Sequence, residues 1–392
     1  MDAAPGLNAE QRRLIELAAR LAKERFAPRA AQVDATAVFP FENYEDLRRH
    51  GLLGLTVPRE YGGLGADSLT YSLVLHEISK GCAATGLTFN MHSAILAFLD
   101  QLATPDQKAR YFREAAGEGK VFASITSEPG SSFRDKFSVG TGIKRLDGRY
   151  VINGTKHFCS LSTGADYYFT WGVLEEAADI REGLITLLVP RDTPGITIEE
   201  TWDTLGMRGT ASHTMHYRDC AVPISQVVGE PGAILGKDMS IWSLGYTAVY
   251  LGIAEAAYDF AVNFARTQKF RPAMTPVMEH PQVQRTIGEM NTILESARQL
   301  LYEAARMRGA EDRRAKTLAM NRAKYAASEA GVAISQLALR LCGGRGILKA
   351  FPLERHLRDA MAGPVMPPSN DRCLETIGKL ALGMEAATLE FS

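Results

Sequence analysis

A glycine-rich turn and a lone histidine carry the side-chain and backbone chemistry that a functional site would need. Cys342-Gly-Gly-Arg-Gly346 follows a long helical pattern, and glycines there permit positive φ and close approach of the backbone to a ligand. The alternative is an ordinary helix C-cap, which a single glycine would satisfy. His92 is a titratable group within an apolar helical pattern. A packed core histidine is the commoner outcome there and a catalytic base the rarer one.

The cysteines argue against a metal centre and against a disulfide framework. Five are present, an odd number, and no two of them have CxxC spacing: Cys82, Cys159, Cys220, Cys342 and Cys373. Scattered single thiols are typical of proteins from a reducing compartment. We therefore expect no metal site and a cytoplasmic protein.

The overall charge excludes another class of function. Among 392 residues, 44 are Lys or Arg and 45 are Asp or Glu, which gives a net charge of -1. No basic stripe is present, so nucleic-acid binding has no electrostatic support. The first 20 residues lack the pattern of a signal peptide, and no apolar run approaches the roughly 20 residues that span a bilayer. We expect no membrane partner.

Residues 1–120 have the pattern of a helical domain. Asn8 with Gln11 is a capping-box pair, and Thr104 with Gln107 is a second one. Ser68 is predicted to cap a helix that runs to Gly81. These signals place helices throughout the first third of the chain.

Residues 121–228 change to the pattern of a β-domain. Asn153-Gly154 lies between β-type runs and predicts a hairpin turn. Further strands are predicted at 184–190, 195–200 and 212–223. The domain should thus be mostly strands joined by short turns.

Residues 229–392 return to long helical patterns, at about 238–268, 282–308 and 313–341. Each exceeds the usual helix length of globular proteins, which is typical of a bundle. The sequence therefore predicts an α+β multidomain protein with the order helices, sheet, helical bundle.

This order, together with six sequence segments, resembles the acyl-CoA dehydrogenase family over nearly the whole chain. The segments are SEPG at 127–130, VINGTKHF at 151–158, GMRGTASHT at 206–214, LGIAEAAYDFAVNFA at 251–265, CGGRG at 342–346 and PLERHLRDA at 352–360. The resemblance implies an N-terminal α-helical domain, a central β-barrel and a C-terminal four-helix bundle. It also implies a homotetramer or homodimer that holds FAD at subunit interfaces.

The resemblance assigns flavin contacts to two segments of the β-domain. Thr126 and Ser127 match the positions at the pyrimidine edge of the ring. Phe158 and Ser160 match the positions beside the middle ring, with the Ser160 hydroxyl near N5. The family usually has Trp and Thr at the latter two, and the replacements keep an aromatic wall and a hydroxyl. The alternative is that 121–160 is only β-domain core and turn.

A second group of predicted cofactor contacts comes from the bundle. These positions, which by the resemblance include diphosphate contacts from a neighbouring subunit, are Phe270, Arg340, Gly343, Gly344, Gly346, Ser369 and Asp371. Two phosphate partners differ from the family pattern: its arginine is Thr267, and its glutamine is Arg340. FAD is therefore the expected cofactor, with FMN as the alternative.

The family's catalytic base has no counterpart in this sequence. A glutamate shortly after the RDA segment removes the substrate's α-proton in acyl-CoA dehydrogenases, and the matching residue here is Pro367. A few members carry the glutamate on the first long bundle helix, where this chain has Trp242. Proline and tryptophan accept no proton, so the identity of the base stays open, with His92 as a weak candidate.

Four residues are candidates for substrate binding. Ser131 and Ser132 match a segment that touches the pantetheine arm of the substrate in the family. Trp242 and Tyr246 are spaced to line a substrate wall, although such an aromatic stripe is usually packing.

Three functions remain open. The first is dehydrogenation of an acyl thioester on CoA or an acyl carrier protein, with an electron-transfer partner. It would use an unusual base or a substrate acidic enough to need little help. The second is a monooxygenase of the same fold, which would use reduced flavin and O₂. The third is a catalytically inactive or half-site subunit within a hetero-oligomer.

Overall fold

Helices form the first part of the chain in the computed structural model, which describes residues 6–130, 138–272 and 274–385. They are α1 (Ala9–Leu21), α2 (Ala27–Thr36), α3 (Phe41–Arg49), α4 (Ser68–Gly81), α5 (Ala83–Leu102) and α6 (Pro105–Arg113). Both predicted capping boxes are confirmed, at Asn8 for α1 and at Thr104 for α6. The predicted cap of α4 is wrong by one residue. The side chain of Asp67, not of Ser68, accepts the hydrogen bond from the backbone N–H of Thr70.

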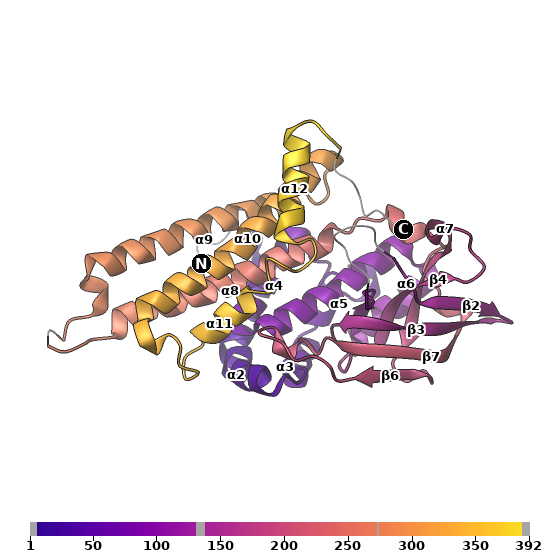
Figure 1. Ribbon diagram of the computed structural model, residues 1–392, viewed down its shortest axis with the longest axis horizontal. Helices are drawn as coiled ribbons and strands as arrows, with labels where there is room; N and C mark the ends of the chain where they lie inside the picture. Colours follow the sequence, from indigo (N-terminus) through magenta and orange to yellow (C-terminus); the bar gives the residue numbers. More distant parts are fainter. Residues whose placement is uncertain (1–5, 131–137, 273, 386–392) are drawn as a thin grey trace.

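The central part is a seven-stranded sheet, which Figure 1 shows at one end of the molecule. Its strands are β1 (Phe122–Ile125), β2 (Gly142–Leu146), β3 (Arg149–Cys159), β4 (Tyr167–Leu174), β5 (Leu184–Pro190), β6 (Ile196–Glu199) and β7 (His213–Pro223). The order is β1-β4-β2-β3-β7-β6, and β5 pairs with β4. A short helix, α7 (Ile180–Gly183), lies between β4 and β5.

The hairpin predicted at Asn153-Gly154 is wrong, because both residues lie inside β3. The register between β3 and β7 shifts between Ile152 and Gly154, so the pair marks a bulge. A Cβ at Gly154 would lie 2.5 Å from the Thr141 hydroxyl, which explains the glycine by close packing. The Asn153 side chain exchanges two hydrogen bonds with Asp219 on β7.

The last part is the helical bundle, and its three long helices are confirmed. They are α8 (Ser240–Thr267), α9 (Pro281–Met307) and α10 (Arg313–Cys342), followed by the shorter α11 (Leu353–Ala360) and α12 (Asn370–Ala381). Figure 1 shows these long helices running along the molecule beside α4 and α5, with the sheet at one end. The predicted architecture of helical domain, β-domain and helical bundle is therefore confirmed.

A buried group of charges joins the first and last parts. The carboxylate of Glu255 on α8 lies 2.7 Å from Lys80 Nζ, 2.7 Å from Arg298 Nη2 and 3.0 Å from His76 Nε2. Burial alone would raise the pKa of Glu255, but these three bases outweigh burial and lower it. Burial likewise works to lower the pKa of His76, but the carboxylates of Glu255 and Glu77 outweigh it and raise the pKa. α4, α8 and α9 thus share one ionic centre.

The described residues contain neither a helix that could cross a membrane nor a cluster that could hold a metal ion. No helix in residues 6–130, 138–272 and 274–385 is long and apolar enough to cross a membrane. Within the same ranges, no group of three or more His, Cys, Asp or Glu side chains is arranged to hold a metal ion. All five cysteines are free and buried.

Candidate functional site

The end of β3 holds an aromatic ring out toward solvent. Phe158 has φ of +55°, a backbone conformation that bulky residues rarely adopt, and the residue is 59% exposed. Its ring lies edge-on to the ring of His157 at 4.4 Å between centroids and to Trp202 at 6.0 Å. Strained backbone and an exposed apolar ring are together typical of a surface that a ligand covers.

The two flavin-contact segments expected from the resemblance lie side by side. The carbonyl of Ser127 accepts a hydrogen bond from the backbone N–H of His157, at 2.8 Å. Lys156 Nζ lies 3.4 Å from the carbonyl oxygen of Thr126. The Ser160 hydroxyl, half-buried, lies 2.8 Å from the hydroxyl of Ser212. The structure therefore places Thr126 and Ser127 beside the segment that contains Phe158 and Ser160, and these four residues are called the Phe158 surface below.

A buried ion pair lies next to this surface and joins its two segments. Lys156 Nζ lies 2.6 Å from Glu128 Oε1, and the Lys156 side chain is fully buried. Glu128 also accepts hydrogen bonds from the backbone N–H and the hydroxyl of Thr141. Burial would raise the pKa of Glu128, but Lys156 and these donors lower it, so the carboxylate stays ionised. Glu128 is thus a structural anion beneath the turn.

The glycine-rich turn at the end of α10 is open. Gly343 has φ of +61°, and a Cβ placed on Gly343 or on Gly344 would meet no atom within 4 Å. Gly346 differs, because a Cβ there would lie 2.8 Å from the carbonyl oxygen of Leu339. Packing within the chain therefore accounts for Gly346, whereas Gly343 and Gly344 leave room for a ligand.

Two cations accompany this turn. The guanidinium of Arg345 stacks over the ring of Phe270, 4.7 Å from the ring centroid. Arg340 is exposed in the last turn of α10, and its carbonyl accepts the N–H of Gly343. Arg345 was not singled out from the sequence, although it lies within the glycine-rich segment. Phe270, Arg340 and the glycines form one cationic and aromatic end of the bundle.

Within one chain, this end of the bundle does not reach the Phe158 surface. α8 begins beside the sheet, where Trp242 packs on Phe98, and it runs for 28 residues, about 42 Å, before Phe270. Figure 1 shows the far ends of α8 and α10 at the opposite end of the bundle from the strands. The glycine-rich turn with Phe270 and the residues around Phe158 therefore lie at opposite ends of the chain's long axis.

The remaining predicted cofactor residues lie at the start of α12. Ser369 is its N-cap and accepts a hydrogen bond from the backbone N–H of Arg372, at 3.4 Å. Asp371 is exposed in the first turn. Beneath the preceding loop, Lys324 Nζ donates to the carbonyl of Gly363 and to Asn370 Oδ1, both at 2.9 Å. Burial lowers the pKa of Lys324 to about 8. This lysine fixes both ends of the loop that contains Pro367.

The candidate substrate wall is buried between α5 and α8. The Trp242 ring lies 4.8 Å from Phe98, and the Tyr246 hydroxyl lies 3.9 Å from Met91 Sδ. Among the described residues, the buried Nε1–H of Trp242 and the hydroxyl of Tyr250 have no hydrogen-bond partner. Such groups can meet a bound molecule, so they mark the wall as a candidate surface for substrate. The other two predicted substrate residues, Ser131 and Ser132, lie outside the described residues.

His92 is placed in the core, which corrects the expectation that it could act as a base. Its Nε2 lies 2.8 Å from the carbonyl oxygen of Leu53, and its Nδ1 accepts the backbone N–H of Phe122 at 3.1 Å. Both nitrogens are therefore used, and the tautomer is set with the proton on Nε2. Burial lowers the pKa of His92 to about 4. The ring joins α5 to β1.

The segments GMRGTASHT and PLERHLRDA meet at a junction of all three parts of the chain. Arg358 on α11 donates to both carboxylate oxygens of Asp34 on α2, at 2.8 and 2.6 Å. Arg208 Nε donates to the carbonyl of Asp34 at 2.9 Å. Asp359 Oδ1 accepts the backbone N–H of Met207 at 2.6 Å. The junction thus holds Met207 and Arg208, in the segment that also carries Ser212, the hydrogen-bond partner of Ser160.

We expect Asp359→Asn to reduce the pH dependence of stability. Burial raises the pKa of Asp359 to about 6, above the ordinary value of 3.8. The stability that this group contributes is therefore fully present below pH 3.8 and lost as pH rises through 6, an effect on the order of 3 kcal/mol. Asparagine can still accept from Met207, but it does not titrate. The melting temperature of the variant, measured from pH 4 to 8 beside the parent, should vary less over this window. Parallel curves of melting temperature against pH for the variant and the parent would contradict the raised pKa of Asp359.

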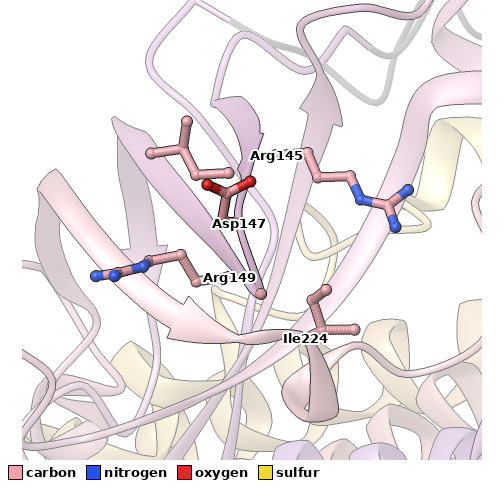
Figure 2. Close-up of a pocket in the computed structure, with 6 residues that line it drawn as sticks. Arg145, Asp147, Arg149 and Ile224 are labelled. Carbon is pink, nitrogen blue, oxygen red and sulfur yellow. The ribbon is translucent and has the colours of Figure 1, made fainter.

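A hollow in the surface lies at the other end of the sheet from Phe158. It is lined by Arg145, Leu146, Asp147, Gly148, Arg149 and Ile224, around the turn that joins β2 to β3. Figure 2 shows the side chains of Arg145 and Arg149 directed away from each other, with Asp147 between them. Arg149 and Phe158 are nine residues apart along β3, roughly 30 Å. The hollow is therefore separate from the candidate site.

All three parts of the chain match domains of known proteins. Residues 8–118, 123–220 and 243–382 match the N-terminal, middle and C-terminal domains described for acyl-CoA dehydrogenases. The human mitochondrial short-chain specific acyl-CoA dehydrogenase is 33% identical over 351 residues, 88% of this chain and 84% of the human protein. An acyl-CoA dehydrogenase of Bacillus subtilis is 32% identical over 384 residues, 95% of this chain and 98% of its own length. The chain belongs to the acyl-CoA dehydrogenase family.

Solved structures agree with this membership. Butyryl-CoA dehydrogenase from Megasphaera elsdenii has a TM-score of 0.88, covers 97% of this chain and 100% of its own, and is 24% identical, which shows the shared fold. FMN-bound TdsC from Paenibacillus sp. A11-2 also has a TM-score of 0.88, at 28% identity and with 97% and 99% of the two chains covered. TdsC is described as a dibenzothiophene monooxygenase. This acyl-CoA dehydrogenase family member is thus similar to proteins of both kinds.

Several residues of this acyl-CoA dehydrogenase family member could not be singled out from sequence. Lys324 lies in an amphipathic helix, where a lysine normally faces solvent, so its complete burial had no local signal. Asp359 lay within a matching segment, but its titration depends on burial among three domains. Trp202, just before GMRGTASHT, is the aromatic neighbour of Phe158 and had no motif of its own.

Proposed function

We propose that this chain is a flavin-dependent oxidoreductase that acts on an acyl thioester by α,β-dehydrogenation-type chemistry without the family's usual glutamate. The thioester would be carried by CoA or by an acyl carrier protein. An electron-transfer partner would reoxidise the enzyme, and FAD is the proposed cofactor, with FMN as the alternative. A homotetramer or homodimer is the proposed assembly.

The exposed Phe158 ring beside a hydroxyl is the observation that carries this proposal. A flavin would cover the ring, and the Ser160 hydroxyl would lie near N5. Thr126 and Ser127 would face the pyrimidine edge. The exposed Gly343 and Gly344, with the nearby guanidinium of Arg345, suit an anionic diphosphate. When bound, the flavin would accept the substrate's β-hydrogen as hydride.

The substrate would lie against the buried stripe on α8. Trp242, Tyr246 and Tyr250 are spaced four residues apart, so they share one helix face. A Cβ at Gly363 would lie 3.2 Å from the Tyr250 ring, which places Tyr250 beside the loop that contains Pro367. Burial raises the pKa of Tyr250 well above its ordinary value, so this phenol would donate hydrogen bonds and would not act as a base.

The lack of a base in the loop is part of the proposal. Residues 361–370 contain no Asp, Glu, His or Lys. The loop instead supplies Pro367, which is exposed, at the position matched to the family's glutamate. The substrate's α-proton would therefore be acidic enough to leave to solvent, or would be accepted by a group outside this loop.

Anaerobic reduction of the bound flavin by a thioester tests the function. The purified protein is loaded with FAD, its absorbance is recorded from 300 to 550 nm, and a mixture of acyl-CoA thioesters is added without O₂. Bleaching of the 450 nm band supports dehydrogenation. An unchanged spectrum with every thioester, on CoA and on carrier protein, would remove this function. Failure to bind flavin would favour a catalytically inactive subunit.

A monooxygenase is the second candidate, and the similarity to FMN-bound TdsC favours it. Phe158 and the segment Gly206–His213 also fit this alternative. The distinguishing measurement is O₂ consumption with added reduced flavin, with an aromatic heterocycle as the trial substrate. Product oxygenated from ¹⁸O₂ would place this candidate first.

We expect Pro367→Glu alone not to create fast dehydrogenation. A positioned general base contributes about 10²–10⁴ to rate, and the variant should gain less than about tenfold. The reason is that Pro368 follows where the family has glycine, while Lys324 fixes the loop at Gly363 and Asn370. Stopped-flow bleaching by a thioester measures the rate, with Pro367→Ala as the control. A gain of 10² or more in the glutamate variant alone would show a family-like loop backbone.

A further inference from the structure

A chain of three hydroxyls leads from the candidate flavin surface into the protein. Ser160 Oγ lies 2.8 Å from Ser212 Oγ, and Ser212 Oγ lies 2.8 Å from Thr210 Oγ1. Thr210 Oγ1 donates to the carbonyl oxygen of Met207 at 2.9 Å. Thr210 is fully buried and Ser212 is 5% exposed. Only Ser160 reaches the surface, so the chain has one open end.

The hydrogen bond from Thr210 to the Met207 carbonyl sets the direction in which every hydroxyl of this series donates. The hydroxyl of Thr210 has one proton, and that proton is directed to the Met207 carbonyl. Thr210 can therefore only accept from Ser212, and Ser212 can then only accept from Ser160. The proton of Ser160 points into the protein in this arrangement. Its lone pairs are the part that faces the candidate flavin surface.

The reverse arrangement is also fully hydrogen-bonded. The Met207 carbonyl has two other donors, the backbone N–H of Thr210 at 3.1 Å and Nε1–H of Trp202 at 3.1 Å. It therefore stays satisfied when the Thr210 hydroxyl rotates away. Thr210 can then donate to Ser212, Ser212 to Ser160, and Ser160 outward. Each hydroxyl keeps its own proton, so the reversal is three rotations with no net proton transfer.

We propose that Thr210 and Ser212 are positioning residues that let Ser160 switch between donating to the oxidised flavin and accepting from the reduced one. The inference rests on the proposed flavin function. N5 of an oxidised flavin is a hydrogen-bond acceptor, and N5 of a reduced flavin carries a proton and is a donor. A fixed serine proton would suit only one of these states, whereas the reversible chain suits both.

The midpoint potential of the bound flavin is the test, because it requires neither substrate nor turnover. The FAD-loaded protein is titrated anaerobically with dithionite against a reference dye. In Ser212→Ala, Ser160 loses the acceptor for its inward proton. The arrangement in which Ser160 accepts from the reduced N5 is therefore less favourable, so the reduced flavin is stabilised less. One hydrogen bond corresponds to about a tenfold change in the ratio of the two states. For a two-electron couple that is a potential lower by about 30 mV.

Matched variants distinguish an effect of the hydroxyl chain from a general loss of rigidity in the turn around Ala211. Thr210→Val should lower the potential in the same direction, and Thr210→Ser, which keeps the hydroxyl, should restore the parent value. Ser162→Ala is the control, because its buried hydroxyl donates to the Ala211 carbonyl in the same turn but is not part of the chain. Its potential should equal that of the parent.

The outcomes distinguish this inference from the proposed function. A parent-like potential in Ser212→Ala, with flavin bound, overturns the inference, as does an equal shift in Ser162→Ala. Bound flavin that no thioester bleaches removes the proposed dehydrogenation, while the potentials still decide the role of the chain. A protein that binds flavin in neither redox state overturns both.

Discussion

Gly344→Trp is expected to give a folded protein that no longer retains flavin. A Cβ at Gly344 meets no atom of its own subunit within 4 Å, so an indole there has open space in the fold. The proposed diphosphate contact is at this turn, and an indole would occupy its approach. The affinity for flavin should fall by at least about tenfold, which corresponds to roughly 1.4 kcal/mol of binding, and the flavin content per subunit, read from the 450 nm absorbance of the purified protein, should fall with it.

Gly309→Trp is the matched control for this prediction. Gly309 is exposed between α9 and α10, and a Cβ there also meets no atom within 4 Å. It lies near the opposite end of α10, a helix of 30 residues and so about 45 Å long. Its flavin content should equal that of the parent. Full flavin in Gly344→Trp would remove this glycine from the site.

Glu255→Ala is expected to be strongly destabilising. Removal of this carboxylate leaves two buried bases, His76 and Arg298, and the half-buried Lys80 without their shared counter-ion. Loss of one partner from a buried ionic group typically costs about 3–5 kcal/mol. Lys80 keeps Asp259 at 3.0 Å and Arg298 keeps Glu295 at 3.1 Å, so we expect a value near the lower end. The melting temperature should fall by about 5 °C or more.

An exposed ion pair on α9 supplies the control. Glu303 lies 3.1 Å from Arg306, with about half of the glutamate side chain exposed, and such pairs contribute about 0–1 kcal/mol. Glu303→Ala should therefore leave the melting temperature nearly unchanged. A similar small effect in both variants would mean that the Glu255 centre is not needed to hold the bundle on the first helices.

The long bundle helices could be predicted because their signal is local. Apolar residues repeat along 240–342 at helical spacing, and the same stripe packs the helices together. The capping boxes at Asn8 and Thr104 were predictable for the same reason, since residues three apart make both hydrogen bonds. Helix type and approximate extent therefore follow from neighbours in sequence.

The misplaced hairpin shows where local information ends. Asn-Gly is the strongest short turn signal, but Asn153 pairs with Asp219, 66 residues away, and Gly154 packs against Thr141. The turn itself is at Asp147-Gly148, where Gly148 has φ of +71°. Both Asp147-Gly148 and Asn153-Gly154 have residues typical of turns. Contacts with residues distant in sequence determine which of the two forms the turn.

Some residues of the candidate site could also be predicted from local sequence, and some of its contacts could not. Phe158 and Ser160 could be proposed because a matching sequence segment carries both. The link from Ser160 to Ser212 could not, because it depends on how β3 and β7 pair, and their register shifts between Lys156 and Cys159. Burial of Lys324 and Asp359 also arises only when separate parts of the chain pack together.

The distance between the Phe158 surface and the glycine-rich turn has a consequence for how the protein behaves on dilution. Under the proposed assignment each subunit supplies one half of two different sites, so cofactor retention follows mass action between subunits. Flavin should then be released as the protein concentration falls below the dissociation constant of the assembly. Two variants that each damage a different half should also complement each other, because a mixed assembly contains some sites in which both halves are intact.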